Sequence, residues 1–79
     1  MPARPLNAAD ALVGAAVRRA RRVRGLSQAA LAVEVGVTQY AISRVENGRR
    51  SLTLPEAWRL ARALGVTLDD LAPLGRARR

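Results

Sequence analysis

The sequence contains no cysteine and no histidine, and each absence closes a class of function. Without cysteine the chain forms no disulfide and has no thiolate nucleophile, and without both residue types it lacks the usual ligands of zinc. The missing histidine also removes the side chain that most often titrates near physiological pH. A zinc finger is therefore excluded, and we expect neither a metal nor any other cofactor.

Paired carboxylates and long apolar runs are also scarce. Asp69 and Asp70 form the one adjacent acidic pair, and they stand where negative charge favours a helix N-terminus. Because no nucleophile–base or metal constellation is present, the sequence does not predict an enzyme. No apolar run approaches the roughly 20 residues that span a bilayer, and Asn7 and Asp10 interrupt the mildly apolar N-terminal stretch. We expect a soluble, cytoplasmic protein without a membrane partner.

Arginine is abundant instead. All 14 basic residues are arginine and only 6 residues are acidic, so the formal net charge is +8. Such an excess of positive charge favours a polyanionic partner, and nucleic acid is favoured over an anionic membrane. The alternative is a basic surface that is simply solvated, which would give the same count. A domain of this size buries about 60% of the surface that its unfolded chain exposes. Because a domain of this size is only marginally stable, we consider the hypothesis that it associates with a second copy of itself.

Helix signals recur five times along the chain. Helices are predicted over about residues 8–24, 28–35, 39–46, 54–64 and 68–72. Residues suited to the N-cap precede them: Asn7, Ser27, Thr38, Thr53 and Thr67. The apolar positions of the first segment repeat at three and four residues: Leu12, Val13, Ala16, Val17, Ala20 and Val23.

No segment sustains the alternation of a strand, and four of the five helical segments end at a glycine. Pro73 stops the fifth segment. The predicted fold is therefore all-α, a compact five-helix bundle over residues 7–74. A flexible arm over residues 1–6 and a basic tail over residues 75–79 are expected to flank it.

The second and third segments are joined by only Gly36, Val37 and Thr38. Gly36 supplies the positive φ of a tight turn without a Cβ penalty. So short a turn makes the two helices cross steeply, and Ala32 is the small residue expected at the crossing. The remaining positions expected to point inward are Leu31, Val35, Val37, Ile42 and Val45. This is the layout of a helix-turn-helix.

The stretch GLSQAALAVEVGVTQYAISRVENG, with LPEAWRLARALGVTLDDL after it, closely resembles the phage repressor and Cro-type, or Xre-like, helix-turn-helix family. The resemblance covers about residues 12–72 and implies a lambda repressor-like DNA-binding domain. Nine positions meet the family pattern: Gln28, Leu31, Ala32, Gly36, Val37, Ile42, Val45, Glu46 and Gly48. Leu52 and Ala57 depart from it, since many members have proline near the first position and a larger aliphatic residue at the second.

The resemblance also implies which residues meet double-stranded DNA. Helical periodicity places the polar residues of the third segment, about 39–46, on its outer face, where a solvated face is the alternative. In the family this face enters the major groove. The implied base contacts are Gln39, Tyr40, Ser43 and Arg44. The implied phosphate contacts are Ser27, Gln28, Thr38, Asn47, Arg49 and Arg50.

Two further sets of residues have structural expectations. Arg21 and Glu46 match positions that in the family often form a partly buried ion pair between the first and third helices. Trp58 is a candidate for a homodimer interface, joined by Leu68 and Leu71, although all three could instead close the core. Four other arginines of the first helix are expected mainly to face solvent, with one or two reaching the DNA backbone: Arg18, Arg19, Arg22 and Arg24.

The predicted function is a sequence-specific transcriptional regulator of bacterial or phage origin, bound as a dimer to a pseudo-palindromic operator. Its size is similar to restriction–modification controller proteins and small phage repressors. The alternative is a helix-turn-helix module, or an antitoxin-type regulator, that acts mainly through a protein partner. Contact of an exposed acidic residue such as Glu34 with RNA polymerase stays a hypothesis, and no small-molecule effector is evident.

Overall fold

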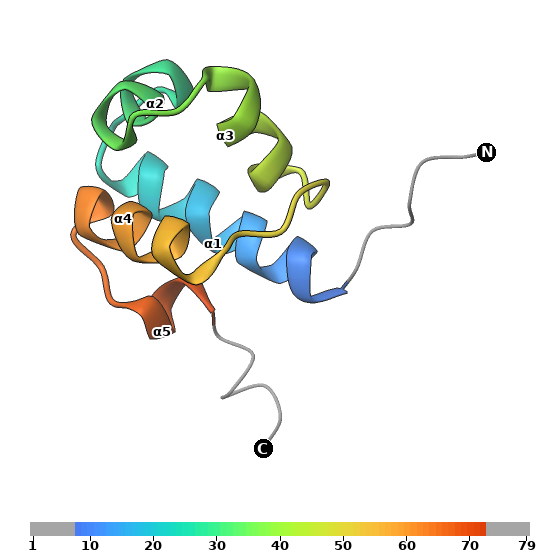
Figure 1. The fold of residues 1–79 in the computed structure, drawn as a ribbon. Coiled ribbons are helices and arrows are strands. Elements are labelled where there is room, and N and C mark those ends of the chain that lie inside the picture. The colour runs from blue at the N-terminus through green and yellow to red at the C-terminus, as the bar shows by residue number, and fades with distance from the viewer. Residues whose placement is uncertain (1–7, 73–79) are drawn as a thin grey trace.

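The computed structural model describes residues 8–72 of the chain, and these form five helices and no strand (Figure 1). The helices are α1 (Ala8–Val23), α2 (Gln28–Val35), α3 (Gln39–Glu46), α4 (Leu54–Leu64) and α5 (Leu68–Leu71). The predicted all-α class and the order of five helices are confirmed. The predicted arm, basic tail, first N-cap and Pro73 lie outside the described residues.

Side-chain hydroxyls fix the start of four helices. Ser27 and Thr38 each accept a hydrogen bond from the backbone N–H three residues later, at 3.0 and 3.1 Å. Thr53 and Thr67 open α4 and α5 with reciprocal capping boxes. Each cap satisfies an N–H group that the helix itself leaves without a partner and typically contributes about 1 kcal/mol. The predicted N-caps therefore set where α2 to α5 begin.

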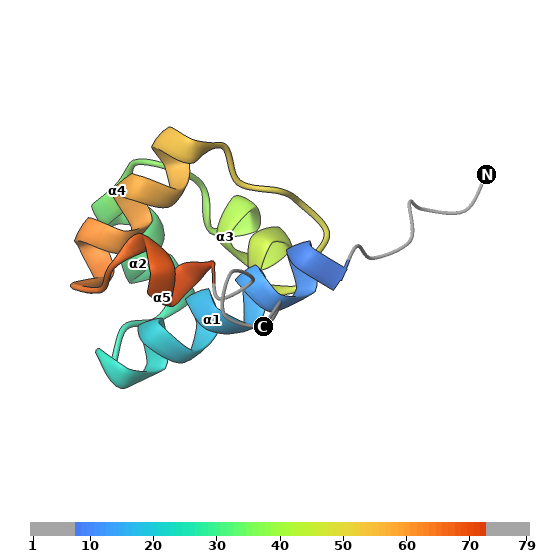
Figure 2. The same ribbon diagram turned by 90° about the horizontal axis from the view of Figure 1, so that it is seen from below.

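All five helices contribute to one apolar core. α1 packs against α3, α4 and α5, and α2 packs against α3 and α4 (Figures 1 and 2). The buried core residues are Val17, Leu31, Ala32, Ile42, Val45, Leu60, Ala61, Leu64 and Leu71. Because α3 contributes one face to this core, its other face is held toward the outside of the molecule.

The inner face of α1 contains most of the predicted apolar stripe, since Val13, Ala16, Val17 and Ala20 are buried or pack against the core, but it differs from the prediction elsewhere. Leu12 is 43% exposed and Val23 is 82% exposed, whereas Gly14, Val17 and Arg21 are buried. These three are spaced at i, i+3 and i+7, which is one side of a helix. The inward face thus also includes a glycine and an arginine, which a hydrophobic pattern does not count.

Another inward expectation also fails. Val37 is 38% exposed, although it was placed with the core, and Leu54 is 71% exposed. Val37 lies in the turn between α2 and α3, and Leu54 is the first residue of α4. Both positions stand at the end of an element, where fewer neighbouring helices are available to cover an apolar side chain.

Gly14 marks the closest approach of α1 to α3. A Cβ atom added there would lie 2.3 Å from the Val45 carbonyl oxygen and 2.8 Å from that of Glu46. Both distances are below van der Waals contact, and both atoms belong to backbone, which cannot move aside as a side chain does. The glycine therefore sets the spacing between the two helices.

Gly14→Ala is expected to destabilise the protein by about 1–3 kcal/mol or more, because α1 and α3 must separate. Intrinsic helix propensity alone predicts the opposite sign, a gain of about 1 kcal/mol. Thermal unfolding followed by circular dichroism checks the sign. A higher melting temperature in the variant would contradict the close approach of the two backbones.

Candidate nucleic-acid interface

The turn between α2 and α3 has the short geometry of a helix-turn-helix. Gly36 adopts φ of 76°, in the left-handed region, and ends α2. The N–H of Val37 donates to the Ala32 carbonyl oxygen at 3.0 Å, which closes the last turn of α2. Ala32 is only 3% exposed, in agreement with its expected place at the helix crossing. Only three residues therefore separate the end of α2 from the start of α3, which packs against α1 and α2.

The two faces of α3 differ sharply. Ile42, Val45 and Glu46 point inward and are each no more than 4% exposed. The opposite side presents polar side chains, of which three are exposed and one is half-buried. In chain order these are Gln39, Tyr40, Ser43 and Arg44, with Ser43 the half-buried member. The residues predicted to contact bases thus share one outward face.

Arg44 is held in place before any partner binds. Its guanidinium lies over the Tyr40 ring, 5.7 Å from the ring centroid, and Nη2 donates to the Arg49 carbonyl oxygen at 3.0 Å. Tyr40 is 69% exposed, so stacking of this kind contributes about 0.5–1 kcal/mol. The contacts restrict both long side chains, and this reduces the entropy that they lose when they are immobilised in a complex.

Glu46 at the end of α3 is the centre of a buried polar network. Arg21 donates to both of its carboxylate oxygens, from Nε at 2.6 Å and from Nη2 at 2.9 Å. Gln28 donates at 3.0 Å and Arg18 at 3.3 Å. Burial raises the pKa of Glu46, but its hydrogen bonds from Arg21 and Gln28 outweigh this, so the pKa lies below its ordinary value. The carboxylate stays charged and ties α3 to α1 and α2.

Two residues of this network differ from their expected surroundings. Arg18 was expected to face solvent, but it donates to Glu46 and also, at 2.9 Å, to the side chain of Asn47. Gln28 was expected to contact phosphate, and its amide nitrogen is already held by Glu46. The partners of Arg18 and Gln28 are distant from them in the sequence. The periodicity of a single helix therefore cannot predict these contacts.

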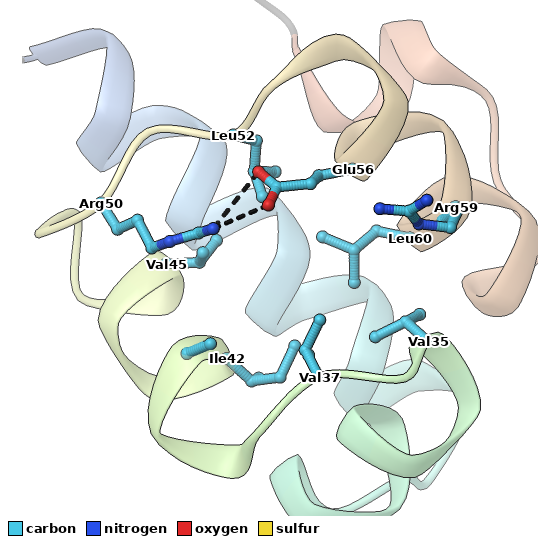
Figure 3. Close-up of a pocket in the computed structure, with 10 residues that line it drawn as sticks. Val35, Val37, Ile42, Val45, Arg50, Leu52, Glu56, Arg59 and Leu60 are labelled. Carbon is cyan, nitrogen blue, oxygen red and sulfur yellow. Dashed lines mark hydrogen bonds and ion pairs between the residues drawn. The ribbon is translucent and has the colours of Figure 1, made fainter.

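The loop after α3 contains two arginines, Arg49 and Arg50. Arg49 is exposed, and its side chain makes no hydrogen bond with residues 8–72. Arg50, in contrast, makes a two-pronged ion pair with Glu56 of α4, at 2.7 and 3.3 Å (Figure 3). The sequence predicted both arginines as phosphate contacts, and only Arg49 is free of a competing acid.

The comparisons with known proteins agree with this geometry. A model of the helix-turn-helix family HTH_3 matches residues 17–71 of the chain. The protein belongs to this family. It is 41% identical over 60 residues to y4dJ of Sinorhizobium fredii, described as an uncharacterized HTH-type transcriptional regulator, with 76% of this chain and 78% of that protein covered.

Two solved structures superpose closely on this one. The restriction–modification controller protein C.AhdI from Aeromonas hydrophila is 32% identical, with a TM-score of 0.78 and coverage of 82% of this chain and 98% of that chain. The clp gene regulator ClgR from C. glutamicum is 27% identical, with a TM-score of 0.80 and coverage of 85% and 86%. The resemblance inferred from the sequence is confirmed.

The ion pair of Arg50 and Glu56 should make the stability of this helix-turn-helix protein depend on acid pH. The hydrogen bond from Arg50, with a second from the Thr53 backbone, lowers the pKa of Glu56 from 4.5 to about 2. A lowered carboxyl pKa stabilises the folded state above the unfolded value, and this stabilisation is lost as pH falls from 4.5 toward 2.

Glu56→Gln is expected to reduce stability at pH 7 by about 1 kcal/mol, because the pair is partly exposed. The variant should also lose less stability than the wild type on acidification through this window. Urea unfolding at a series of pH values measures both quantities. Parallel pH profiles for the two proteins would contradict the ion pair.

A small cavity lies beside this pair. It lies among α2, α3 and α4, has a free volume of ≈ 20 Å³, and is lined mainly by apolar side chains, with the Arg50–Glu56 pair on its wall (Figure 3). Such a volume accommodates about one water molecule. Within residues 8–72 there is also no cluster of acidic side chains that could hold a metal ion. The same part of the chain includes no helix long and apolar enough to cross a membrane.

The three candidate dimer residues have different surroundings. Trp58 is 52% exposed, and the Arg62 guanidinium lies 5.1 Å from the centroid of its ring. Leu68 is 36% exposed, at the start of α5. Leu71 is only 1% exposed and belongs to the core, so it has no surface to offer a second copy and its expected interface role is corrected.

Proposed function

We propose that this protein is a sequence-specific, double-stranded DNA-binding transcriptional regulator that acts in the cytoplasm as a homodimer on a pseudo-palindromic operator. α3 enters the major groove. The observation that carries the proposal is the outer face of α3, whose polar residues are not needed by the core. A helix braced from behind by a buried carboxylate network keeps these side chains in a fixed position.

Base readout is assigned to the four residues of that face. Gln39 begins α3 and makes no side-chain hydrogen bond with the described residues, so its amide is available for adenine N6 and N7. Arg44 has the donor geometry for guanine O6 and N7. Tyr40 supports Arg44 and is available to a thymine methyl or a phosphate. Ser43 lies between Tyr40 and Arg44 in the sequence and is half-buried, so it is assigned to a base edge that approaches α3 closely.

Backbone contacts are assigned to residues around the ends of α2 and α3. Ser27 and Thr38 stand at helix N-termini, where free N–H groups and the helix dipole favour a phosphate. Gln28 donates its amide nitrogen to Glu46, so its main role is to hold α2 against α3, and only its amide oxygen faces away from Glu46. Asn47, Arg49 and Arg50 follow α3, and Arg50 contacts phosphate only if it leaves Glu56. Such contacts position a protein on DNA without reading its sequence.

Arg49→Ala is expected to weaken binding to every DNA sequence by a similar factor, because phosphate contacts are independent of the bases. The slope of log affinity against log salt should become shallower by about 1. Fluorescence anisotropy between about 50 and 200 mM salt measures this slope. Arg59→Ala removes the same charge from the exposed surface of α4 and serves as the control. Equal slopes for the two variants would contradict the assignment.

The homodimer interface is assigned to α4 and α5, where Trp58 and Leu68 are exposed. One helix in one groove reads too few base pairs for specificity, and helix-turn-helix dimers solve this with half-sites about one turn apart. A half-exposed tryptophan is the type of residue that anchors an interface. A two-fold symmetric binding site is the direct test of this dimer.

Occlusion of a promoter is the simplest mode of regulation for a domain of this size. Glu34 is exposed on α2 and is an acidic residue available for contact with RNA polymerase. A transcription assay on a promoter containing the bound site separates the two modes. Repression that is unchanged in Glu34→Ala supports occlusion, and activation that is lost in this variant supports polymerase contact.

A further inference from the structure

Arg18 connects α1 with the residue that follows α3. Its Nη2 donates to Asn47 Oδ1 at 2.9 Å, and its Nε donates to Glu46 Oε1 at 3.3 Å. The Arg18 side chain is 36% exposed, whereas the Glu46 side chain that anchors it is fully buried. Because the carboxylate holds one edge of the planar guanidinium, the other edge meets Asn47 in a fixed direction.

This contact determines how the Asn47 amide is turned. A guanidinium can only donate hydrogen bonds, so the amide oxygen must face Arg18 and the amide nitrogen must face away. The nitrogen, Nδ2, donates to Ser43 Oγ at 3.4 Å, a long hydrogen bond on the exposed side of α3. This bond occupies one of the two lone pairs of the Ser43 oxygen and turns the hydroxyl hydrogen away from Asn47. No acceptor for its hydroxyl hydrogen lies among residues 8–72.

We propose that Arg18 sets the hydrogen-bond polarity of Asn47 and Ser43, so that both side chains present donors to the DNA. The inference rests on the proposed function, which turns this face of α3 toward base edges. In the major groove guanine, adenine and thymine each present an acceptor, whereas cytosine presents only its N4 amino donor. With one lone pair occupied by Asn47, the Ser43 hydroxyl is better placed to donate than to accept, and it therefore disfavours cytosine on the strand that it faces.

The first step of the test locates the base that Ser43 faces. Binding sites are selected from a random duplex pool, and the preference among the four bases is scored at each position for the wild type and for Ser43→Ala. The position at which Ser43→Ala flattens the preference is the one that Ser43 reads. There the wild type should deplete cytosine by about threefold to tenfold, the range of one hydrogen bond.

The second step inverts the polarity with Asn47→Asp. A carboxylate only accepts, so one oxygen takes the hydrogen bond from Arg18 and the other takes that of the Ser43 hydroxyl. The Ser43 oxygen then faces the DNA as an acceptor. The preference at the mapped position should shift by a similar factor toward cytosine and adenine, which carry amino groups there. The added negative charge weakens binding to all sequences alike, so only the relative preference is compared.

The third step removes the source of the polarity. Arg18→Ala should flatten the preference at the mapped position and leave the rest of the motif intact. Arg19→Ala, which removes the same charge from an exposed neighbour, should leave every position unchanged. Thermal unfolding is recorded for each variant, since Arg18 also contacts Glu46. If Arg18→Ala fails to fold, the exposed Asn47 position still decides the outcome.

Loss of cytosine depletion in Arg18→Ala, with its reversal in Asn47→Asp, supports the inference. A wild-type motif that is unchanged in both variants overturns it and leaves the proposed function in place. A wild-type pool without any motif overturns the proposed function, and the inference falls with it.

Discussion

Glu46→Ala is expected to lower the free energy of unfolding by about 3–5 kcal/mol. The substitution removes the carboxylate from a site that is 4% exposed and leaves the Arg21 guanidinium buried without its counter-ion. At about 0.05–0.15 kcal/mol per residue, a domain of this length has roughly 4–12 kcal/mol in total. The variant should therefore be partly or largely unfolded at 37 °C.

Urea unfolding at pH 7, followed by circular dichroism, measures this loss. Glu34→Ala removes an exposed glutamate from α2 and should change stability by no more than about 0.5 kcal/mol. The double variant Arg21→Met with Glu46→Leu should recover much of the loss, because it removes both charges and fills the space. A Glu46→Ala variant as stable as the Glu34→Ala control would contradict the buried network.

The double variant Gln39→Ala with Arg44→Ala is expected to lose its preference for the operator while it keeps its fold. Each side chain is suited to a bidentate base contact that discriminates by about 1–3 kcal/mol. Removal of both should weaken operator binding by about 30-fold to 10⁴-fold relative to the wild type. Both residues are exposed, so unfolding should change by no more than about 1 kcal/mol, most of it from the lost stacking of Arg44 on Tyr40.

Competition binding with the operator and a scrambled duplex of equal length measures this preference. Arg59→Ala, on the surface of α4, removes one positive charge and should weaken binding to both duplexes by the same factor. A double variant that retained the wild-type ratio between the duplexes would show that another surface reads the bases.

The helices and their ends could be predicted because their signals are local. Ser27, Thr38 and Thr53 each cap a helix through an N–H group three residues away, and Gly36 ends α2 within the same turn. Such contacts are visible in a short window of sequence. The outer face of α3 could be predicted from the sequence for the same reason, since helical periodicity alone separates Gln39 and Arg44 from the core.

The remaining features depend on contacts between distant elements. Gly14 is required by the approach of the α3 backbone, and no local pattern distinguishes it from a neutral small residue. Arg18 finds Asn47 across the α1–α3 contact, and Arg50 finds Glu56 only when the loop after α3 folds back on α4. The sequence identified these arginines as basic surface and could not show which of them already have partners.

Selection of bound sites from a random DNA duplex pool, at about physiological salt, tests the central claim most directly, since low salt inflates non-specific binding. The expected result is a two-fold symmetric motif with half-sites about one helical turn apart. Recovery of a pool without base preference, at a salt concentration where the protein still binds DNA, would contradict sequence-specific readout by α3.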